Sequence, residues 1–337
     1  MPADHLKRPA PEAVPPAARL TDAVRSVLAG QPVTTVAERH ALESDELAEA
    51  VDVYDQAGQA ALYDRSADAT WWQANLEFDD WNRAEETVVA DLAPVLDHLA
   101  QKELLHGWWF IRKAPCWRLR LHPGDSDELQ AHASAQLDHL VERKRIGSWR
   151  PSYYEPEALA FGGPAGIRIA HSLFSADSAN LMAHLRTGQM PLGRRELSML
   201  LCTELFRAAG QEPFEAADIW SRVAHLRSPG AETQTQPGLV QQLRAVLSYD
   251  TSPDGPLFTS DGTLASGHGW AAAFHDSGRH LTRAANEGNL DRGVRRILAH
   301  HVIFHWNRLG LDVHTQHALA RAAATALLDG TTLDEDA

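Results

Sequence analysis

Cysteine is scarce in this chain of 337 residues, which contains only Cys116 and Cys202. The two residues lie far apart in the sequence and in different predicted elements. The sequence therefore favours neither a disulfide framework nor a cysteine-based zinc site. We expect both side chains to be buried thiols.

Long apolar runs are also missing. No segment approaches the roughly 18 consecutive apolar residues of a membrane span, and the N-terminus lacks the apolar core of a signal peptide. These absences predict a protein without a membrane anchor, and we expect a cytoplasmic location.

The chain has few positively charged residues relative to negatively charged ones. It contains 31 Lys and Arg residues and 45 Asp and Glu residues, which give a formal net charge of -14. Nucleic-acid binding over a whole surface requires clustered Lys and Arg. The charge therefore excludes such binding, except within a local basic groove. The length permits one large domain or two to three smaller ones, and the 44% hydrophobic and 23% charged residues are typical of a globular protein.

Four common catalytic signatures are absent from the sequence. There is no GxxxxGK[ST] phosphate loop, no GxGxxG fingerprint after a predicted strand, no GxSxG nucleophile elbow and no CxxC pair. This disfavours NTPases, dinucleotide-dependent oxidoreductases and serine hydrolases of the α/β type. The sequence implies no cofactor.

The N-terminal part predicts a disordered arm followed by a helical module. Residues 1–17 are rich in Pro and Ala and lack periodicity. Residues 18–66 predict a short helix, a second short helix and a long helix, an order that resembles a helix-turn-helix bundle. The third helix is acidic, which argues against direct DNA binding and favours docking or dimerisation.

Residues 67–330 predict a compact α+β unit. Residues 70–78 alternate as a strand does, and a helix is expected over 81–100. Residues 106–123 form a hairpin-like pair, followed by an amphipathic helix and an extended segment, in outline a split βαβ arrangement. The expected fold is therefore a small antiparallel or mixed sheet with flanking helices, followed by a mostly helical C-terminal half. Its helices are expected near 164–185, 193–209, 214–227, 237–248, 267–287, 291–309 and 314–328.

The segment "CWRLRLHP" places two cations on one face of the expected hairpin. Side chains alternate along a strand, so Arg118 and Arg120 point away from Trp117 and Leu119. Adjacent arginines repel unless an anion lies near them, and arginine binds carboxylates and phosphates through two bonds. The alternatives are a solvent-facing pair, or a pair that binds Glu77 on a neighbouring strand.

The segment "YYEPEALAFGGPAG" brings a carboxylate close to a tight turn. Pro156 holds Glu155 in an extended conformation, and Gly162 and Gly163 let the chain turn into a helix with proline in its first turn. Glu157 lies just before that turn. It can act as a general base or orient an amine, and it can equally be a plain ion-pair partner.

The segment "LAHHVIFHWNRLGLD" places two histidines and an arginine on one helical stripe, because His301, His305 and Arg308 are spaced by four and seven residues. Zinc is disfavoured, since the metalloprotease glutamate and a third ligand are missing. Proton transfer suits a histidine better. The alternative is a packed helix with both histidines at its polar edge.

In this order, "WWFIRKAPCWRLRL", "YEPEALAFGGPAGIRIAHSLFSADS" and "FHWNRLGL" resemble the family of the lantibiotic dehydratase C-terminal domain, also called the thiopeptide-type bacteriocin biosynthesis domain. The resemblance runs from Trp71 to Leu328 and indicates a stand-alone member with an added N-terminal module. It implies one of two activities on a leader-bearing precursor peptide. One is elimination of glutamate from glutamylated Ser or Thr. The other is formal cycloaddition of two dehydroalanines to a pyridine ring, with release of the leader.

The resemblance also implies particular site residues. The two arginines of the eliminating family fall on Arg118 and Arg120, and its glutamate falls on Glu157. The next arginine of the family falls on Ala160 and its histidine on Ile303, so both are missing here. His301 and His305 flank the latter position.

The chemistry of elimination distributes roles among these residues. A base removes the Cα proton and cations bind the departing carboxylate. We expect Arg118 and Arg120 to bind the leaving group, His301 or His305 to transfer the proton, and Glu157 to hold the glutamyl ammonium. Elimination is favoured because the arginine pair and Glu157 remain.

Cycloaddition needs mainly positioning and an aromatic cavity, which Trp108, Trp109, Trp117, Trp149 and Trp306 can supply. A third alternative is a docking subunit without catalysis that binds the leader as an added strand. The residues expected to contact a substrate are Trp108, Trp109, Trp117, Tyr154, Trp306, Asn307 and Arg308. The expected partners are a precursor peptide with leader and core and a separate tRNA-dependent glutamylation subunit, with a homodimer also compatible with the sequence.

Overall fold

The computed structural model describes residues 16–68, 71–124, 128–188, 191–230 and 237–330. The chain divides into two compact units, residues 1–69 and residues 70–337, and each is described by itself. Most of the arm expected over residues 1–17 lies outside the described residues. No helix in the described ranges is long and apolar enough to cross a membrane.

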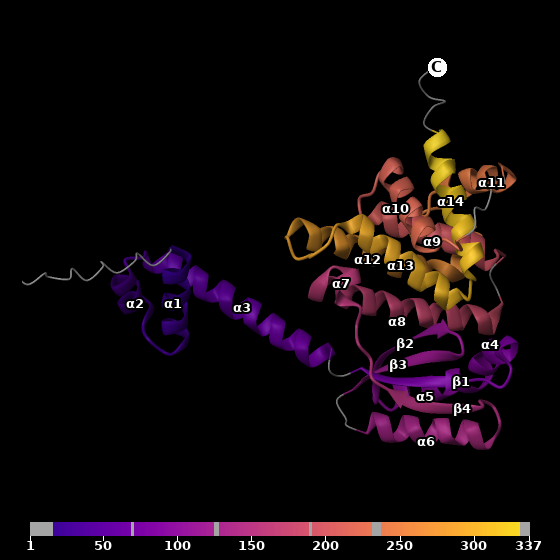
Figure 1. The fold of residues 1–337 in the computed structure, drawn as a ribbon, viewed down its shortest axis with the longest axis horizontal. Helices are drawn as coiled ribbons and strands as arrows, with labels where there is room; N and C mark the ends of the chain where they lie inside the picture. Colours follow the sequence, from indigo (N-terminus) through magenta and orange to yellow (C-terminus); the bar gives the residue numbers. More distant parts are fainter. Residues whose placement is uncertain (1–15, 69–70, 125–127, 189–190, 231–236, 331–337) are drawn as a thin grey trace, which may run out of the picture. The chain divides into compact units, whose positions relative to one another are not determined.

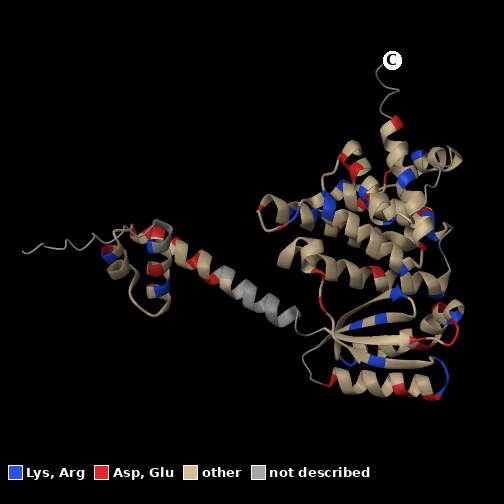
Figure 2. Cartoon of the chain, viewed as in Figure 1, with Lys and Arg blue, Asp and Glu red and all other residues tan. Residues whose placement is uncertain are grey.

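The first unit consists of three helices, as the sequence predicts. They are α1 (Pro16–Leu28), α2 (Val33–His40) and α3 (Ser44–Asp68). Their apolar residues form a separate small core that contains Ala23, Val24, Val36, Ala37 and Leu47. The described part of α3 carries several acidic side chains (Figure 2).

A four-stranded sheet begins the second unit. Its strands are β1 (Trp72–Glu77), β2 (Leu105–Lys113), β3 (Cys116–Pro123) and β4 (Ser148–Ser152), in the order β2-β3-β1-β4. All three pairings are antiparallel. The expected split βαβ arrangement is confirmed, and the sheet is antiparallel rather than mixed. The hairpin between β2 and β3 bends at Ala114-Pro115, whose peptide bond is cis.

Helical segments connect the strands. The helix expected over 81–100 is a series of short segments, namely η1 (Trp81–Arg83), α4 (Ala84–Thr87), the π-helical η2 (Val88–Leu92) and α5 (Ala93–Gln101). The connection from β3 to β4 contains α6 (Leu129–Glu142). Figure 1 shows α6 and α8 on opposite sides of the sheet, so both faces are covered by helices.

The C-terminal half is helical, as expected. It contains α7 (Ala158–Phe161), α8 (Gly163–Thr187), α9 (Arg194–Ala208), α10 (Pro213–Leu226), α11 (Pro237–Ser248), η3 (Ala265–Gly267), α12 (His268–Asn286), α13 (Val294–Leu309) and α14 (Val313–Gly330). One hydrophobic core joins the sheet to these helices. Cys116 and Cys202 are free, buried thiols, which confirms that expectation.

Glycines at the junction of α7 and α8 allow a tight turn. Gly162 and Gly163 have φ of 92° and 85°, which side chains rarely adopt. Pro164 follows in the first turn of α8, where a missing N–H is tolerated. The predicted turn is therefore present, and it positions both Glu157, just before α7, and the first turns of α8.

Close approach of the backbone makes Gly166 a sensitive position. A Cβ at Gly166 would overlap the carbonyl oxygen of Phe161. We expect Gly166→Ala to lower the free energy of unfolding by about 1–3 kcal/mol, because the backbone of α7 must shift. Urea unfolding followed by tryptophan fluorescence measures this, since all ten tryptophans lie in the second unit.

Gly269→Ala is the matched control for Gly166→Ala. Gly269 also lies in a helix, but the nearest atom to its added Cβ is Asn180 Oδ1 at 3.8 Å, an ordinary contact. We expect it to be neutral or stabilising by up to about 1 kcal/mol. Equal stabilities of the two variants would contradict the packing described for the turn.

Candidate functional site

Two arginines and two amides face the same side of the sheet. Arg118 lies opposite Asn75 and Arg120 lies opposite Gln73 in the pairing of β1 with β3. Directly opposed side chains share a face of the sheet, while Leu119 points to the other face. The register thus places Arg118 and Arg120 side by side, as alternation predicts.

Arg120 is enclosed by aromatic rings, with only 3% of its surface exposed. Its guanidinium carbon lies 4.0 Å from the centroid of the Trp109 ring and 4.5 Å from that of Tyr154. Its Nε donates to Gln73 Oε1 at 2.8 Å, and its Nη1 has no hydrogen-bond partner among the residues that the structure describes. A solvent-facing position or a pair with Glu77 is therefore wrong for Arg120.

Arg120 stays a cation despite its burial. Burial lowers the pKa of Arg120 to about 10, while the nearby Tyr154 and Glu157 side chains oppose the shift. A charge in low-dielectric surroundings attracts an entering carboxylate more strongly than one in water. The guanidinium is thus prepared to bind an anionic group.

Tyr154 and His171 form a hydrogen-bonded pair beside Arg120. The Tyr154 hydroxyl and His171 Nε2 lie 2.7 Å apart. Burial and the nearby Arg120 lower the pKa of His171 to about 3, so the imidazole is neutral. The Trp71 ring packs 5.0 Å from that of His171. This packing holds the phenol in place next to the guanidinium.

The remaining two charged residues of this region are more accessible. Arg118 is half-buried and Glu157 is exposed, and within the described ranges neither forms a hydrogen bond or ion pair through its side chain. Glu157 lies near enough to Arg120 to influence its pKa. We call Arg118, Arg120, Tyr154, Glu157 and His171 the Arg120 site.

His305 and Arg308 belong to a different, fully buried network. Asp177 on α8 accepts hydrogen bonds from His305 Nδ1 at 2.9 Å, Arg308 Nε at 2.7 Å and Trp270 Nε1 at 2.8 Å. Burial by itself raises the pKa of Asp177, yet His305 and Arg308 lower it to about 2. The network therefore joins α8, α12 and α13.

His301 is buried against aromatic rings. Its ring lies 5.0 Å from that of Phe161 and 6.0 Å from that of Phe174, and in the described part of the chain neither ring nitrogen has a hydrogen-bond partner. Burial lowers its pKa to about 3. The idea that both histidines lie at a polar edge is wrong, because α13 is packed on the side that carries His301, His305 and Arg308.

The predicted aromatic wall is not formed by the structure. Trp109 faces the Arg120 site, whereas Trp117 points to the other side of the hairpin and stacks on Phe110 at 4.8 Å. Trp108 shares that other face. Trp306 lies in the helical layer, where its ring stacks on Trp220 at 5.6 Å. Only Trp109 of the predicted contact tryptophans thus borders the Arg120 site.

Two further predicted contact residues also lie elsewhere. Asn307 Oδ1 accepts hydrogen bonds from Arg227 at 3.1 Å and Gln316 at 3.0 Å, which joins helices. Arg308 is buried in the Asp177 network. Within the described ranges, no three His, Cys, Asp or Glu side chains are grouped to hold a metal ion.

Several residues of this region could not be selected from sequence patterns. His171 follows Glu157 by 14 residues, in the segment "GIRIAHSLF", and a single histidine on a helix carries no spacing signal. Gln73 and Trp71 belong to an ordinary alternating strand. Asp177 sits in "FSADS", where a lone acid on an amphipathic helix reads as a surface residue. Tertiary contacts alone select these four.

The sequence matches the family model of the lantibiotic biosynthesis dehydratase C-terminal domain over residues 71–327. The chain belongs to this family, and the predicted resemblance is confirmed. The membership supports a place in the maturation of ribosomally made, modified peptides, without selecting a reaction. A comparison with curated proteins finds no match.

Solved structures show the same fold. The tRNA-dependent lantibiotic dehydratase MibB from Microbispora sp. 107891 aligns with a TM-score of 0.57 and 19% identity over 78% of this chain, which spans only 28% of MibB. TsrL aligns at 0.51 with 18% identity, over 79% of this chain and 97% of TsrL. The pyridine synthase TbtD from thiomuracin biosynthesis aligns at 0.52 with 14% identity, over 77% of this chain and 98% of TbtD.

Proposed function

We propose that this protein is an enzyme that eliminates glutamate from glutamylated Ser or Thr residues of a precursor peptide, and that the Arg120 site performs the reaction. The observation that carries the proposal is the buried Arg120 cation, one of whose nitrogens has no partner within the described ranges, beside a half-buried Arg118. Family membership supports a peptide substrate.

The reaction transfers one proton and breaks one carbon–oxygen bond. A base takes the Cα proton of the modified residue, the electron pair forms the Cα=Cβ double bond, and the Cβ–O bond breaks to release glutamate as a carboxylate. Arg118 and Arg120 bind the developing carboxylate. Glu157, which is exposed and without a partner among the described residues, holds the glutamyl ammonium.

In this proposal Tyr154, positioned by His171, transfers the proton in place of the histidines of α13. The side chains of His301, His305 and Tyr154 are all buried. His305, however, is bound to Asp177, whereas the Tyr154 ring lies 4.5 Å from the guanidinium carbon of Arg120. Tyr154 acts as the base in its phenolate form, which the neighbouring Arg120 guanidinium stabilises, and it becomes a neutral phenol when it takes the Cα proton. The hydrogen bond between His171 Nε2 and the Tyr154 oxygen orients this oxygen.

Tyr154→Phe tests this role. The change removes only the hydroxyl and keeps the ring over Arg120, so we expect kcat for glutamate release to fall about 10²-fold or more. Tyr153→Phe is the matched control, because Tyr153 is the neighbouring residue and is 87% exposed. Release rates measured by mass spectrometry that are equal for both variants would remove Tyr154 from the mechanism.

A second candidate function is formal cycloaddition of two dehydroalanines. It is favoured by two positions, because Ala160 and Ile303 stand where the eliminating family resemblance places an arginine and a histidine, and neither side chain can transfer a proton or bind a carboxylate. The Trp71, Trp109 and Tyr154 rings around Arg120 also suit a flat, apolar substrate.

Two substrates separate the candidates. The protein is incubated with a glutamylated peptide and, separately, with an azole peptide that contains dehydroalanines, and masses are followed. Loss of glutamate supports elimination, and a macrocycle with released leader supports cycloaddition. Binding without a mass change supports a leader-docking subunit and contradicts both enzymatic proposals.

The partners follow from the proposed reaction. A precursor peptide with leader and core is the substrate, and a separate tRNA-dependent glutamylation subunit supplies the ester that is eliminated. The helical module of the first unit is suited to docking or dimerisation, because its α1 and α3 surfaces border an apolar groove of about 500 Å3 that includes Val24 and Val53.

A further inference from the structure

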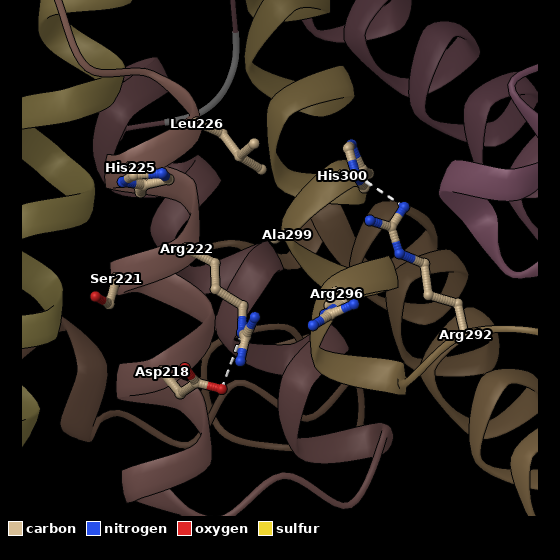
Figure 3. Close-up of a pocket in the computed structure, with 9 residues that line it drawn as sticks. All are labelled: Asp218, Ser221, Arg222, His225, Leu226, Arg292, Arg296, Ala299 and His300. Atoms are coloured by element: carbon tan, nitrogen blue, oxygen red, sulfur yellow. Dashed lines mark hydrogen bonds and ion pairs between the residues drawn. The ribbon is translucent and has the colours of Figure 1, made fainter.

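A positively charged cleft lies between α10 and the start of α13 (Figure 3). Its volume is about 450 Å3, and a neighbouring cavity of about 490 Å3 is lined by the same Arg222, Arg292 and Arg296. We call the two cavities together the α10–α13 cleft. Figure 3 shows Arg222 and Arg296 approaching the space between the two helices from opposite sides.

The positive charge of the cleft is only partly neutralised. Four arginines and three carboxylates line it, and the carboxylate of Asp218 already binds Arg222 at 3.0 Å and Arg295 at 3.2 Å. Arg296 is exposed and forms no side-chain hydrogen bond or ion pair within the described ranges. In a chain with a net charge of -14, such a local excess of cations is suited to an anionic ligand.

The first turn of α13 adds hydrogen-bond donors to the same place. Gly293 caps this helix of 16 residues without a side-chain bond, and Gly293 and Val294 line the second cavity. The first N–H groups of a helix have no acceptor within it and favour anions. Backbone donors and arginine side chains thus converge on one cavity.

The cleft also borders the segment that leads to the Arg120 site. Arg292 Nη1 contacts His300 Nε2 at 3.4 Å and the Leu159 carbonyl oxygen at 3.5 Å. Burial and the nearby Arg292 lower the pKa of His300, so it is a neutral acceptor. Leu159 is 79% exposed and follows Glu157 by two residues. An extended ligand can therefore run from the Arg120 site over Leu159 into the cleft.

The composition of the cleft favours a peptide over a nucleic acid. Acidic residues Glu215, Asp218 and Asp291 line it together with the arginines, and its lining contains the apolar Leu226 and Val294. Single-stranded nucleic acids require a continuous basic groove with aromatic side chains for stacking, and among the described residues no Phe, Tyr or Trp lines either cavity.

We propose that the α10–α13 cleft binds an acidic segment of the peptide substrate, with side-chain carboxylates on Arg292 and Arg296 and apolar side chains against Leu159 and Leu226. The proposal rests on the proposed function, since it assumes a peptide substrate. It adds a second binding region, separate from the residues that act on the reacting bond.

Fluorescence anisotropy on the full chain tests the cleft. The probe is a fluorescein-labelled synthetic peptide of alternating glutamate and leucine, and its control replaces every glutamate with glutamine. We expect the glutamate peptide to bind more tightly than the glutamine peptide, with an affinity that falls as salt rises. Arg296→Glu and Arg292→Glu are expected to weaken this binding about tenfold or more.

Arg143→Glu is the matched charge control, because Arg143 is exposed, lies after α6 and lines neither cavity. Equal affinities for wild type and Arg296→Glu, or no preference for glutamate over glutamine, would overturn the proposal. Tighter binding of a labelled single-stranded oligonucleotide that Arg296→Glu abolishes would assign the cleft to nucleic acid instead. Peptide binding through Arg296 by a protein that leaves both test substrates unchanged would retain the cleft and overturn only the proposed reaction.

Discussion

Arg120→Lys is expected to lower kcat/KM for glutamate release by about 10²- to 10³-fold, the range observed when one donor to a developing anion is removed. Lysine keeps the positive charge but lacks the planar guanidinium that stacks between Trp109 and Tyr154 and reaches Gln73. The carboxylate would then lose a donor held in fixed geometry. Mass spectrometry of the glutamylated peptide over time measures the effect.

Arg143→Lys controls for arginine replacement in general, since Arg143 is exposed and remote in the sequence from the sheet face that carries Arg120. Its release rate should equal that of wild type. Thermal unfolding checks that Arg120→Lys remains folded. A folded Arg120→Lys variant that releases glutamate within threefold of the wild-type rate would remove Arg120 from the site.

Asp177→Asn is expected to destabilise the second unit by about 3–5 kcal/mol, as is typical when one partner of a buried ion pair is removed. Asparagine keeps the shape, but it leaves Arg308 as a buried cation without a counter-charge, and its amide cannot accept from His305, Arg308 and Trp270 together. Urea unfolding followed by tryptophan fluorescence measures the loss.

The carboxylate of Asp177 also makes the free energy of unfolding depend on pH. The pKa of Asp177 in the folded protein, about 2, lies below the value of 3.8 for a free Asp side chain. Its contribution to stability is therefore complete when the pH is above 3.8. It is lost as pH falls toward about 2. The stability gap between wild type and Asp177→Asn should therefore narrow below about pH 4.

Asp276→Asn is the control for Asp177→Asn, because Asp276 lies on α12 with an exposed side chain. Its free energy of unfolding should stay within about 0.5 kcal/mol of wild type. If Asp177→Asn is as stable as Asp276→Asn, the network does not hold α8, α12 and α13 together.

Local patterns were sufficient to predict the elements of the second unit. The alternation of "CWRLRL" predicted both a strand and the shared face of Arg118 and Arg120, and the antiparallel register agrees. Gly162, Gly163 and Pro164 predicted a turn into a helix, which α8 begins. Such features depend on neighbours within a few residues, so a sequence contains them directly.

The candidate site was only partly accessible from the same patterns. The helical spacing of His301, His305 and Arg308 correctly placed them on one stripe, but it did not show that the stripe faces the core. The acid that holds two of them, Asp177, is 128 residues before His305. A pairing over that distance leaves no spacing signal in a single sequence.

The sequence by itself determined the helices and strands, the side-by-side arginines, the free cysteines and the family. Only the tertiary structure decided that Arg120 lies between Trp109 and Tyr154, that His171 orients the phenol, and that the α13 histidines are enclosed. The physical reason is that alternation and helical period set the direction of a side chain relative to its own element. Its burial, its pKa and its partners depend on the elements that pack against it.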